Sequence, residues 1–411
     1  MEAGDDAKHP NPSAHQLLCR AGEAYGPAMN LSAKHAMGGT SPSGQCVQSP
    51  DMVASQAFPG LATPAGAGYP EAMDAICPNT TPSAAYLAAE GFEAELETEL
   101  TRRGQAVRWH GRLALSDAPP IHAAWALECW TAPVLLPAPS VKAAADALRA
   151  IQRNWALLPT LHHRRAALIE ARLPPVKARA LTFPEPAPTG HLGGWTMLDN
   201  GTLLASPTKT SPFVNGTPRF VEDREGPPSR AYLKLWEALT RLGRMPGPGE
   251  ECLDLGASPG GWTWVLARLG AAVTAVDKSP LDPAIAAMPG VSWLGESAFG
   301  LEPRPVDWLF SDIICYPERL LGLVERWMAA GARNIVCTLK FQGETDHAVV
   351  ERFAAIPGSS VFHAAQNKHE LTFARLAPVE ARLAPDEARL APDKARPTPI
   401  EARLWPEGGE G

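Results

Sequence analysis

The chain has 411 residues, which is enough for two or three domains. Hydrophobic residues make up 45% and charged residues 20%, ordinary values that exclude collagen, a coiled coil and a wholly disordered chain. No run of about 18 apolar residues occurs, so the sequence predicts no membrane span. The first 30 residues contain Asp5 and Asp6 and lack a long apolar core, which argues against a secretory signal. We therefore expect a cytoplasmic protein.

The seven cysteines and the net charge of −7 bear on metals and nucleic acids. The cysteines form no CxxC pair, so no thiolate metal site is expected, and their odd number indicates reduced thiols.

Residues 1–100 carry a net charge of −9, whereas residues 101–376 carry +4. The middle of the chain is mildly basic, so the acidic total does not exclude an RNA partner.

Both ends of the chain are predicted to be disordered. Residues 1–80 are rich in Gly, Pro, Ser and Ala and show no helical or strand periodicity. From Arg375 a seven-residue unit recurs, first as RLAPVEA, and it fills the tail at 377–411. Each unit contains proline, which costs a helix interior about 3 kcal/mol and so excludes a coiled coil.

A first folded segment is predicted over residues 82–200. Phe92, Leu96 and Leu100 share one helical face, strand-like pieces follow, and a helix is expected near 140–153. These elements predict an α+β domain.

A basic stretch lies inside this segment, between residues 149 and 179, with Glu170 as its one acid. Basic side chains beside Trp155 and two histidines suit phosphate contacts and base stacking, although a solvated helix face is an equal alternative. The candidate RNA-binding residues are Arg153, Arg164, Arg165, Arg172, Lys177 and Arg179.

A second folded segment, about 218–376, alternates strands with helices, which predicts a mostly parallel, doubly wound sheet covered on both faces. Its strand-like runs are 251–256, 272–277, 291–295, 306–312, 334–341, 360–365 and 370–376. A helix is expected over 317–330, with Pro317 at its start and Gly331 beyond its end. Ligands of such sheets bind at the carboxyl ends of the strands.

The first of these strands ends in the motif DLGASPGGW. Its glycines allow a sharp turn and a close approach to a ligand, and a helix start follows that favours an anionic group. Asp277 ends the second strand and is placed to accept hydrogen bonds from ribose hydroxyls. A dinucleotide fingerprint requires glycine at 256, 258 and 261, but position 258 is serine and is followed by Pro259, which argues against a nicotinamide oxidoreductase. The pattern predicts an adenosine-containing cofactor; a structural turn without a ligand is the alternative.

The motif resembles the S-adenosylmethionine loop of the FtsJ-like ribose 2′-O-methyltransferases, and SRAYLKLWEAL (229–239) resembles another segment of that family. Further pieces, among them KTSPFVNGTPRF (209–220), CTLKFQG (337–343) and KHELTFARL (368–376), are similar to the branch that methylates a cytidine ribose of bacterial 23S rRNA. The resemblance covers about 205–376 well and 82–200 more weakly.

This resemblance implies a Rossmann-like class I methyltransferase domain at 229–376, a linker at 201–228, and a THUMP-like, ferredoxin-like RNA-binding region at 82–200. It implies S-adenosylmethionine as cofactor, 23S rRNA or its assembly precursor as partner, and no metal. The implied cofactor-binding residues are Asp254, Gly256, Ser258, Pro259, Gly260, Gly261, Trp262, Asp277, Glu296, Ser297 and Asp312. Position 297, where a carboxylate would bind adenine, is a serine, and Glu296 would face the other way on a regular strand.

The family's catalytic tetrad falls on Lys234, Asp312, Lys340 and Glu370. Asp312 and Lys340 end strand-like runs and Glu370 begins one, so these three groups are expected to converge at one edge of the sheet. On its predicted helix, Lys234 points away from the apolar stripe. The resemblance implies that Lys340 is the general base, that Asp312 orients it, and that Glu370 positions Lys234 or the ribose.

Two other functions remain open. Cys315 follows Asp312 by three residues, as the nucleophile does in RNA cytosine-C5 methyltransferases, but Ile314 stands where those enzymes have proline. The chain can also be a non-catalytic rRNA-binding assembly factor, an alternative that Ser297 favours. Protein partners are not indicated.

Overall fold

The computed structural model describes residues 80–378. The leader and tail for which disorder is predicted lie outside these residues, except at their borders. No helix within residues 80–378 is both long enough and apolar enough to cross a lipid bilayer.

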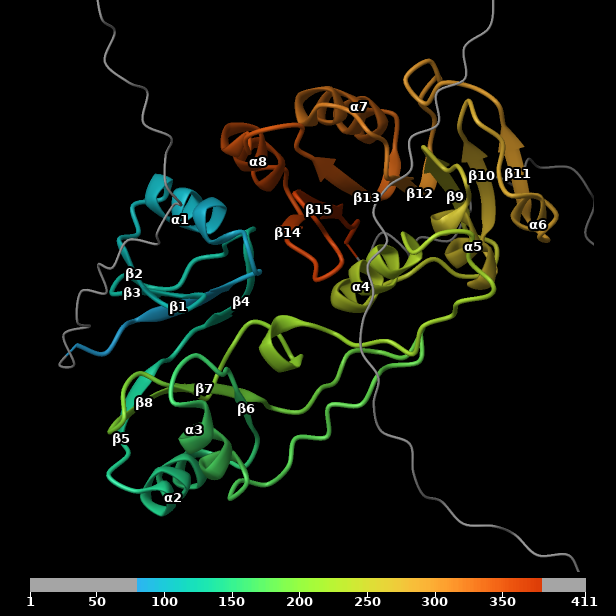
Figure 1. The fold of residues 1–411 in the computed structure, drawn as a ribbon. Helices are drawn as coiled ribbons and strands as arrows, with labels where there is room; N and C mark the ends of the chain where they lie inside the picture. Colours follow the sequence, from blue (N-terminus) through green and yellow to red (C-terminus); the bar gives the residue numbers. More distant parts are fainter. Residues whose placement is uncertain (1–79, 379–411) are drawn as a thin grey trace, which may run out of the picture. The chain divides into compact units, whose positions relative to one another are not determined.

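The described chain begins with a four-stranded antiparallel sheet in the order β2-β3-β1-β4, on which helix α1 lies (Figure 1). Its elements are β1 (Ala84–Ala88), α1 (Glu93–Arg102), β2 (Val107–His110), β3 (Leu113–Ser116) and β4 (Ala126–Trp130). Leu96 and Leu100 are buried, as their helical spacing predicts. The same face carries Glu99, which accepts the main-chain N–H groups of Ala124 and Trp125 at 2.7 and 2.9 Å.

A second four-stranded sheet has the order β5-β8-β7-β6 and is accompanied by the contacting helices α2 and α3. Its elements are β5 (Val134–Pro137), α2 (Val141–Ile151), β6 (Trp155–Leu157), α3 (His163–Glu170), β7 (Gly193–Met197) and β8 (Thr202–Ser206). The Ser140 hydroxyl caps α2 by accepting the N–H of Ala143. Because β8 pairs with β5 and β7, this sheet extends to Ser206, into the range expected to be linker. A 3₁₀ turn, η1 (Val214–Gly216), follows.

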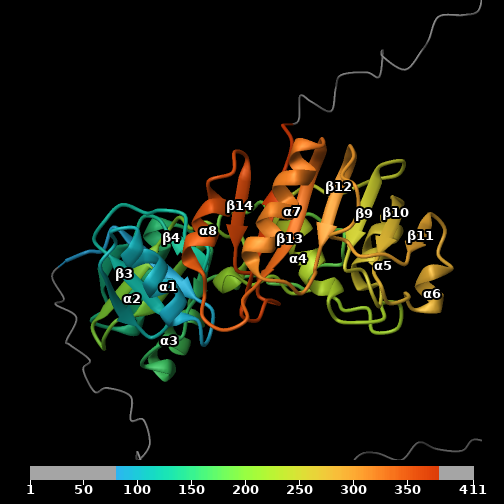
Figure 2. The same ribbon diagram turned by 90° about the horizontal axis from the view of Figure 1, so that it is seen from above.

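The remaining described residues, up to 378, contain a seven-stranded sheet in the order β11-β10-β9-β12-β13-β15-β14. Figure 2 shows these strands side by side, from β14 to β11. The elements are α4 (Tyr232–Leu242), β9 (Glu251–Leu255), α5 (Gly261–Arg268), β10 (Ala272–Val276), α6 (Pro283–Ala286), β11 (Val291–Leu294), β12 (Val306–Ser311), α7 (Pro317–Ala329), β13 (Ala332–Lys340), α8 (His347–Ala354), β14 (Ser359–Phe362) and β15 (Glu370–Arg375). The five strands β9 to β13 are parallel to one another, whereas β15 is antiparallel to both β13 and β14. The predicted mostly parallel α/β sheet is confirmed.

Apolar side chains cover both faces of this sheet. Strand β9 shows the alternation: Cys252 packs in the cluster that contains α4 and α5, and Leu253 and Leu255 pack in the cluster that contains α7 and α8. The strand order reverses between β9 and β12, so the crevice expected to bind a ligand lies between the loops that follow those two strands.

Candidate active site

The glycine-rich loop connects β9 to α5 at this reversal point. Gly256 and Gly260 have φ values of +78° and +114°, in the left-handed region that favours glycine. A Cβ at Gly256 would lie 2.7 Å from the Ile313 side chain, and one at Gly261 would lie 2.7 Å from Ser229 Oγ. At Gly256 the main chain of Ile313 is also within 3.1–3.2 Å, so a side chain there would push the loop away from the chain after β12, whereas at Gly261 the Ser229 side chain would have to shift.

The loop is held on its other side by Asp277, directly after β10. Its carboxylate accepts the main-chain N–H of Ser258 at 3.1 Å and that of Ser279 at 2.9 Å. The Asp277 carbonyl oxygen accepts the indole N–H of the half-exposed Trp293 at 3.2 Å. A carboxylate has about four acceptor positions, so each oxygen of Asp277 can still accept a bond from a ribose hydroxyl.

Two residues of the motif face the protein interior rather than the crevice. Asp254 is 1% exposed and accepts the Thr263 hydroxyl at 2.7 Å. Burial, with the charges of Asp312 and Asp277, raises the pKa of Asp254 to about 7. The buried indole of Trp262 donates to the Ala231 carbonyl oxygen at 3.0 Å, which ties the loop to the start of α4. These side chains shape the loop and do not line it.

The two candidates for adenine recognition lie beyond the third strand. Strand β11 ends at Leu294, and Glu296 N–H donates to the Leu294 carbonyl oxygen at 2.9 Å. Glu296 is exposed and Ser297 is half-buried. Both residues lie in a loop beyond the end of β11, so the strand alternation from which Glu296 is expected to face away from the site does not apply to them.

The four tetrad side chains meet at the carboxyl edge of the sheet. Asp312 directly follows β12, Lys340 is the last residue of β13, and Glu370 is the first residue of β15. Lys340 and Glu370 are cross-strand partners in the antiparallel β13–β15 pair. Lys234 reaches the same point from the first turn of α4. The predicted convergence is therefore observed.

Ion pairs link the tetrad into one network. Lys340 Nζ lies 2.9 Å from Asp312 Oδ1 and donates to the Asp312 carbonyl oxygen at 2.5 Å. Lys234 Nζ lies 2.5 Å from Glu370 Oε1 and 3.8 Å from Asp312 Oδ1. The Glu370 side chain is 8% exposed and the other three are each 18% exposed. Two ammonium groups and two carboxylates balance in charge, and the partial exposure leaves the network open to a substrate.

Cys315 is buried three residues beyond Asp312. Burial raises the pKa of its thiol, although Arg319 and Lys340 act in the opposite direction. A cysteine nucleophile requires the thiolate, which this environment disfavours. The geometry therefore gives no support to a cysteine-dependent reaction.

The six candidate RNA-binding residues do not form one surface cluster. Arg164 and Arg165 lie on α3, where Arg165 donates to the Ala138 carbonyl oxygen at 2.6 Å. Arg172 is exposed just beyond that helix. Arg153, Lys177 and Arg179 instead line a cavity together with Arg219, a residue that the sequence analysis missed. Within residues 80–378, no group of three or more His, Cys, Asp or Glu is placed to hold a metal ion.

Comparison with known proteins bears on the segment that carries Lys234, Asp312 and Lys340. Residues 227–349 match the family model described as FtsJ-like methyltransferase. The resemblance predicted from the sequence is confirmed. Two curated relatives are both named ribosomal RNA large subunit methyltransferase M. The one from Halorhodospira halophila is 44% identical over 133 residues, 31% of this chain and 39% of the relative. The one from Methylococcus capsulatus is 40% identical over 177 residues, 41% of this chain and 49% of the relative.

The matched region thus spans less than half the length of each of these relatives. A solved structure of a fibrillarin pre-rRNA processing protein from Methanococcus jannaschii is 14% identical, with a TM-score of 0.27, over 33% of this chain and 69% of that chain.

Proposed function

We propose that the protein is an S-adenosylmethionine-dependent methyltransferase that acts on the ribose 2′-oxygen of a cytidine in 23S rRNA. The observation that carries the proposal is the Lys234–Asp312–Lys340–Glu370 network, which lies at the carboxyl edge of the sheet where the glycine loop also ends. The names of the matched relatives support an rRNA substrate.

The residues of the crevice fit the cofactor. The left-handed main chain at Gly256 and Gly260, followed by the helix start at Gly261, makes a tight turn whose main chain can approach a ligand closely. Asp277 retains acceptor capacity for ribose hydroxyls, and exposed Glu296 and half-buried Ser297 are the candidates to contact the adenine. When bound, the cofactor supplies an activated methyl group on a positively charged sulfur.

The tetrad supplies a base that accepts the ribose hydroxyl proton and a cation that stabilises the charge on the oxygen. That hydroxyl is a poor nucleophile near neutral pH, so its proton must be taken as it reacts. We assign this role to the neutral amine form of Lys340, whose Nζ accepts the proton and becomes an ammonium that the Asp312 carboxylate, 2.9 Å away, stabilises. The Lys234 ammonium, held by Glu370 at 2.5 Å, stabilises the charge that develops on the 2′-oxygen. Holding that oxygen about 3–3.5 Å from the methyl carbon supplies much of the remaining acceleration.

We further propose that the two N-terminal sheets form a THUMP-like RNA-binding region that presents the substrate. The exposed basic residues Arg153, Arg164, Arg172, Lys177 and Arg179 support this role, because cations on one region neutralise RNA phosphates. The substrate is then 23S rRNA or its assembly precursor, and the cytoplasm is where the protein would meet it.

The proposal is tested by methyl transfer in vitro with full-length protein, labelled S-adenosylmethionine and large-subunit rRNA, followed by nucleoside mass spectrometry. We expect 2′-O-methylcytidine from the wild type and from Cys315→Ala, and a rate about 10²–10⁴-fold lower for Lys340→Ala. Lys142→Ala, an exposed lysine on α2, is the matched control.

Three outcomes would overturn the proposal. Formation of 5-methylcytosine that is lost in Cys315→Ala would indicate the cytosine-C5 reaction. Failure to bind the cofactor in calorimetry would indicate a non-catalytic assembly factor. Equal rates for Lys340→Ala and the wild type would remove Lys340 from the mechanism.

A further inference from the structure

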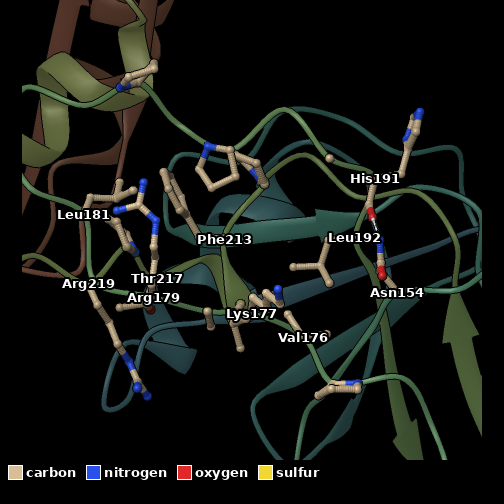
Figure 3. Close-up of a pocket in the computed structure, with 18 of the residues that line it drawn as sticks. Asn154, Val176, Lys177, Arg179, Leu181, His191, Leu192, Phe213, Thr217 and Arg219 are labelled. Atoms are coloured by element: carbon tan, nitrogen blue, oxygen red, sulfur yellow. Dashed lines mark hydrogen bonds between the residues drawn. The ribbon is translucent and has the colours of Figure 1, made fainter.

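A cavity of about 550 Å³ lies outside the candidate active site, on the part of the chain that precedes α4 (Figure 3). Its walls come from three stretches: residues 153–154 before β6, residues 175–192, and residues 212–219 around η1. Its size is within the range of about 300–1,000 Å³ that is usual for ligand sites.

The rim of the cavity is positively charged. Arg153, Lys177, Arg179 and Arg219 are exposed, and no Asp or Glu is among the lining residues. Arg179 is paired with Glu185 through two hydrogen bonds of 2.8 and 3.1 Å. Across residues 80–378, Arg153, Lys177 and Arg219 form no ion pair with a carboxylate. Three charges from three stretches of chain therefore remain available to an anion.

The inner wall is apolar and aromatic. Leu181 and Phe213 are buried side chains with faces on the cavity, and Val176 and Leu192 add further apolar surface. Figure 3 shows Arg179, Arg219 and Leu181 on one side and Leu192 on the other, with Phe213 and Lys177 between them. Such a wall suits a flat base, and a charged rim suits the phosphates attached to it.

Hydrogen bonds between the stretches of chain that form its walls hold the cavity open. Leu181 N–H donates to the Arg219 carbonyl oxygen at 2.8 Å, and Val221 N–H donates to the Leu181 carbonyl oxygen at 2.9 Å. On the opposite side, the Asn154 amide donates to the His191 carbonyl oxygen at 3.2 Å. Five of the lining residues are prolines, which restrict the loops further. A ligand would thus enter a formed site and lose little free energy to ordering.

We propose that this cavity binds one nucleotide of a single-stranded RNA segment that flanks the methylated residue; the inference rests on the proposed function. The base lies against Phe213 and Leu181, and the phosphates on either side of it contact Lys177, Arg153 and Arg219. Cations spread along a rim fit successive phosphates of one strand better than the single carboxylate of an acidic side chain.

The test compares Lys177→Ala/Arg219→Ala with the charge-matched control Lys142→Ala/Arg224→Ala, whose residues lie outside the cavity. The probe is a short fluorescent single-stranded RNA of mixed sequence, titrated over a range of salt concentrations. We expect the cavity variant to bind about tenfold more weakly. The slope of log K against log salt should also fall in magnitude by about 1.4, because about 0.7 is lost for each phosphate contact.

Steady-state methylation of rRNA gives a second readout. The cavity variant should show a raised KM for rRNA with kcat and cofactor affinity unchanged, because the cavity binds the substrate without touching the reacting atoms. Binding, salt slope and KM equal to those of the control would overturn the inference. Equal affinity of the wild type for duplex RNA, or tight binding of free cytidine monophosphate that displaces the RNA, would overturn it as well.

Failure of the proposed function is distinguishable from failure of this inference. If the wild type methylates rRNA but the cavity variant behaves as the control does, the inference fails and the proposed function stands. If cavity-dependent RNA binding is observed without any methyl transfer by the wild type, the proposed function fails and the RNA site stands.

Discussion

Asp254 is a carboxyl group whose environment makes a definite prediction about stability and pH. It is 1% exposed, and its pKa is raised from 3.8 to about 7, mainly by burial. In the unfolded chain the group ionises near its ordinary pKa, whereas the folded protein keeps the proton up to about pH 7. The contribution of Asp254 to stability is therefore fully present below about pH 4 and is lost as the pH rises through about 7.

The magnitude follows from the difference between the two pKa values. Each unit corresponds to about 1.4 kcal/mol, so the full effect is about 4 kcal/mol, of which about 3 kcal/mol falls between pH 5 and pH 8. Asp254→Asn cannot ionise and keeps an oxygen that can accept the Thr263 hydroxyl. Its free energy of unfolding, relative to the wild type, should rise by about 3 kcal/mol over that interval.

Urea unfolding followed by tryptophan fluorescence at the two pH values measures this change. Asp117→Asn, which removes an exposed carboxyl group on the first sheet, is the control and should show little of this dependence. A wild-type minus Asp254→Asn difference that is the same at both pH values would refute the reasoning, since Asp254 would then be ionised in the folded protein.

Three further substitutions test the loop, the tetrad and a buried ion pair. Gly256→Ala should lower the free energy of unfolding by about 1–3 kcal/mol in urea denaturation, because its φ of +78° is strained for alanine; unchanged stability would contradict this. Glu370→Gln should lower kcat about 10–100-fold and leave cofactor affinity in calorimetry unchanged, because Lys234 loses the partner at 2.5 Å; wild-type turnover would remove Glu370 from the network. Lys209→Met should lower the free energy of unfolding by about 3–5 kcal/mol in thermal or urea denaturation, because it leaves the buried Glu128 carboxylate unpaired. Adding Glu128→Gln should restore part of that stability, and no recovery in the double variant would argue against the ion pair.

The seven-stranded sheet could be predicted from the sequence because its strands are short apolar runs separated by turn residues. The helix expected over 317–330 ends at Ala329, since Pro317 fixes its start and Gly331 its end. Most strand ends lie within two residues of their predicted positions, although β14 ends at Phe362, three residues before the predicted end at 365. Asp312 and Lys340 meet because parallel strands place their carboxyl ends at one edge, and Glu370 joins them because it begins the antiparallel strand β15.

Long-range contacts could not be predicted in the same way. Strand β8 completes a sheet begun more than 60 residues earlier, and no local pattern marks 202–206 as a member of it. Arg219 meets Lys177 and Arg153 only because separated stretches fold around one cavity. The buried pair of Lys209 with Glu128 likewise joins residues 81 positions apart. A basic stretch in the sequence indicates an RNA contact, but which cations surround a cavity is decided by the tertiary fold.

Nucleoside mass spectrometry of 23S rRNA from cells with and without the gene tests directly whether the protein methylates a cytidine ribose through Lys340. We expect deletion to remove one 2′-O-methylcytidine, and we expect the wild-type gene to restore it whereas a Lys340→Ala gene does not. Unchanged ribose methylation together with a missing 5-methylcytosine would contradict this expectation.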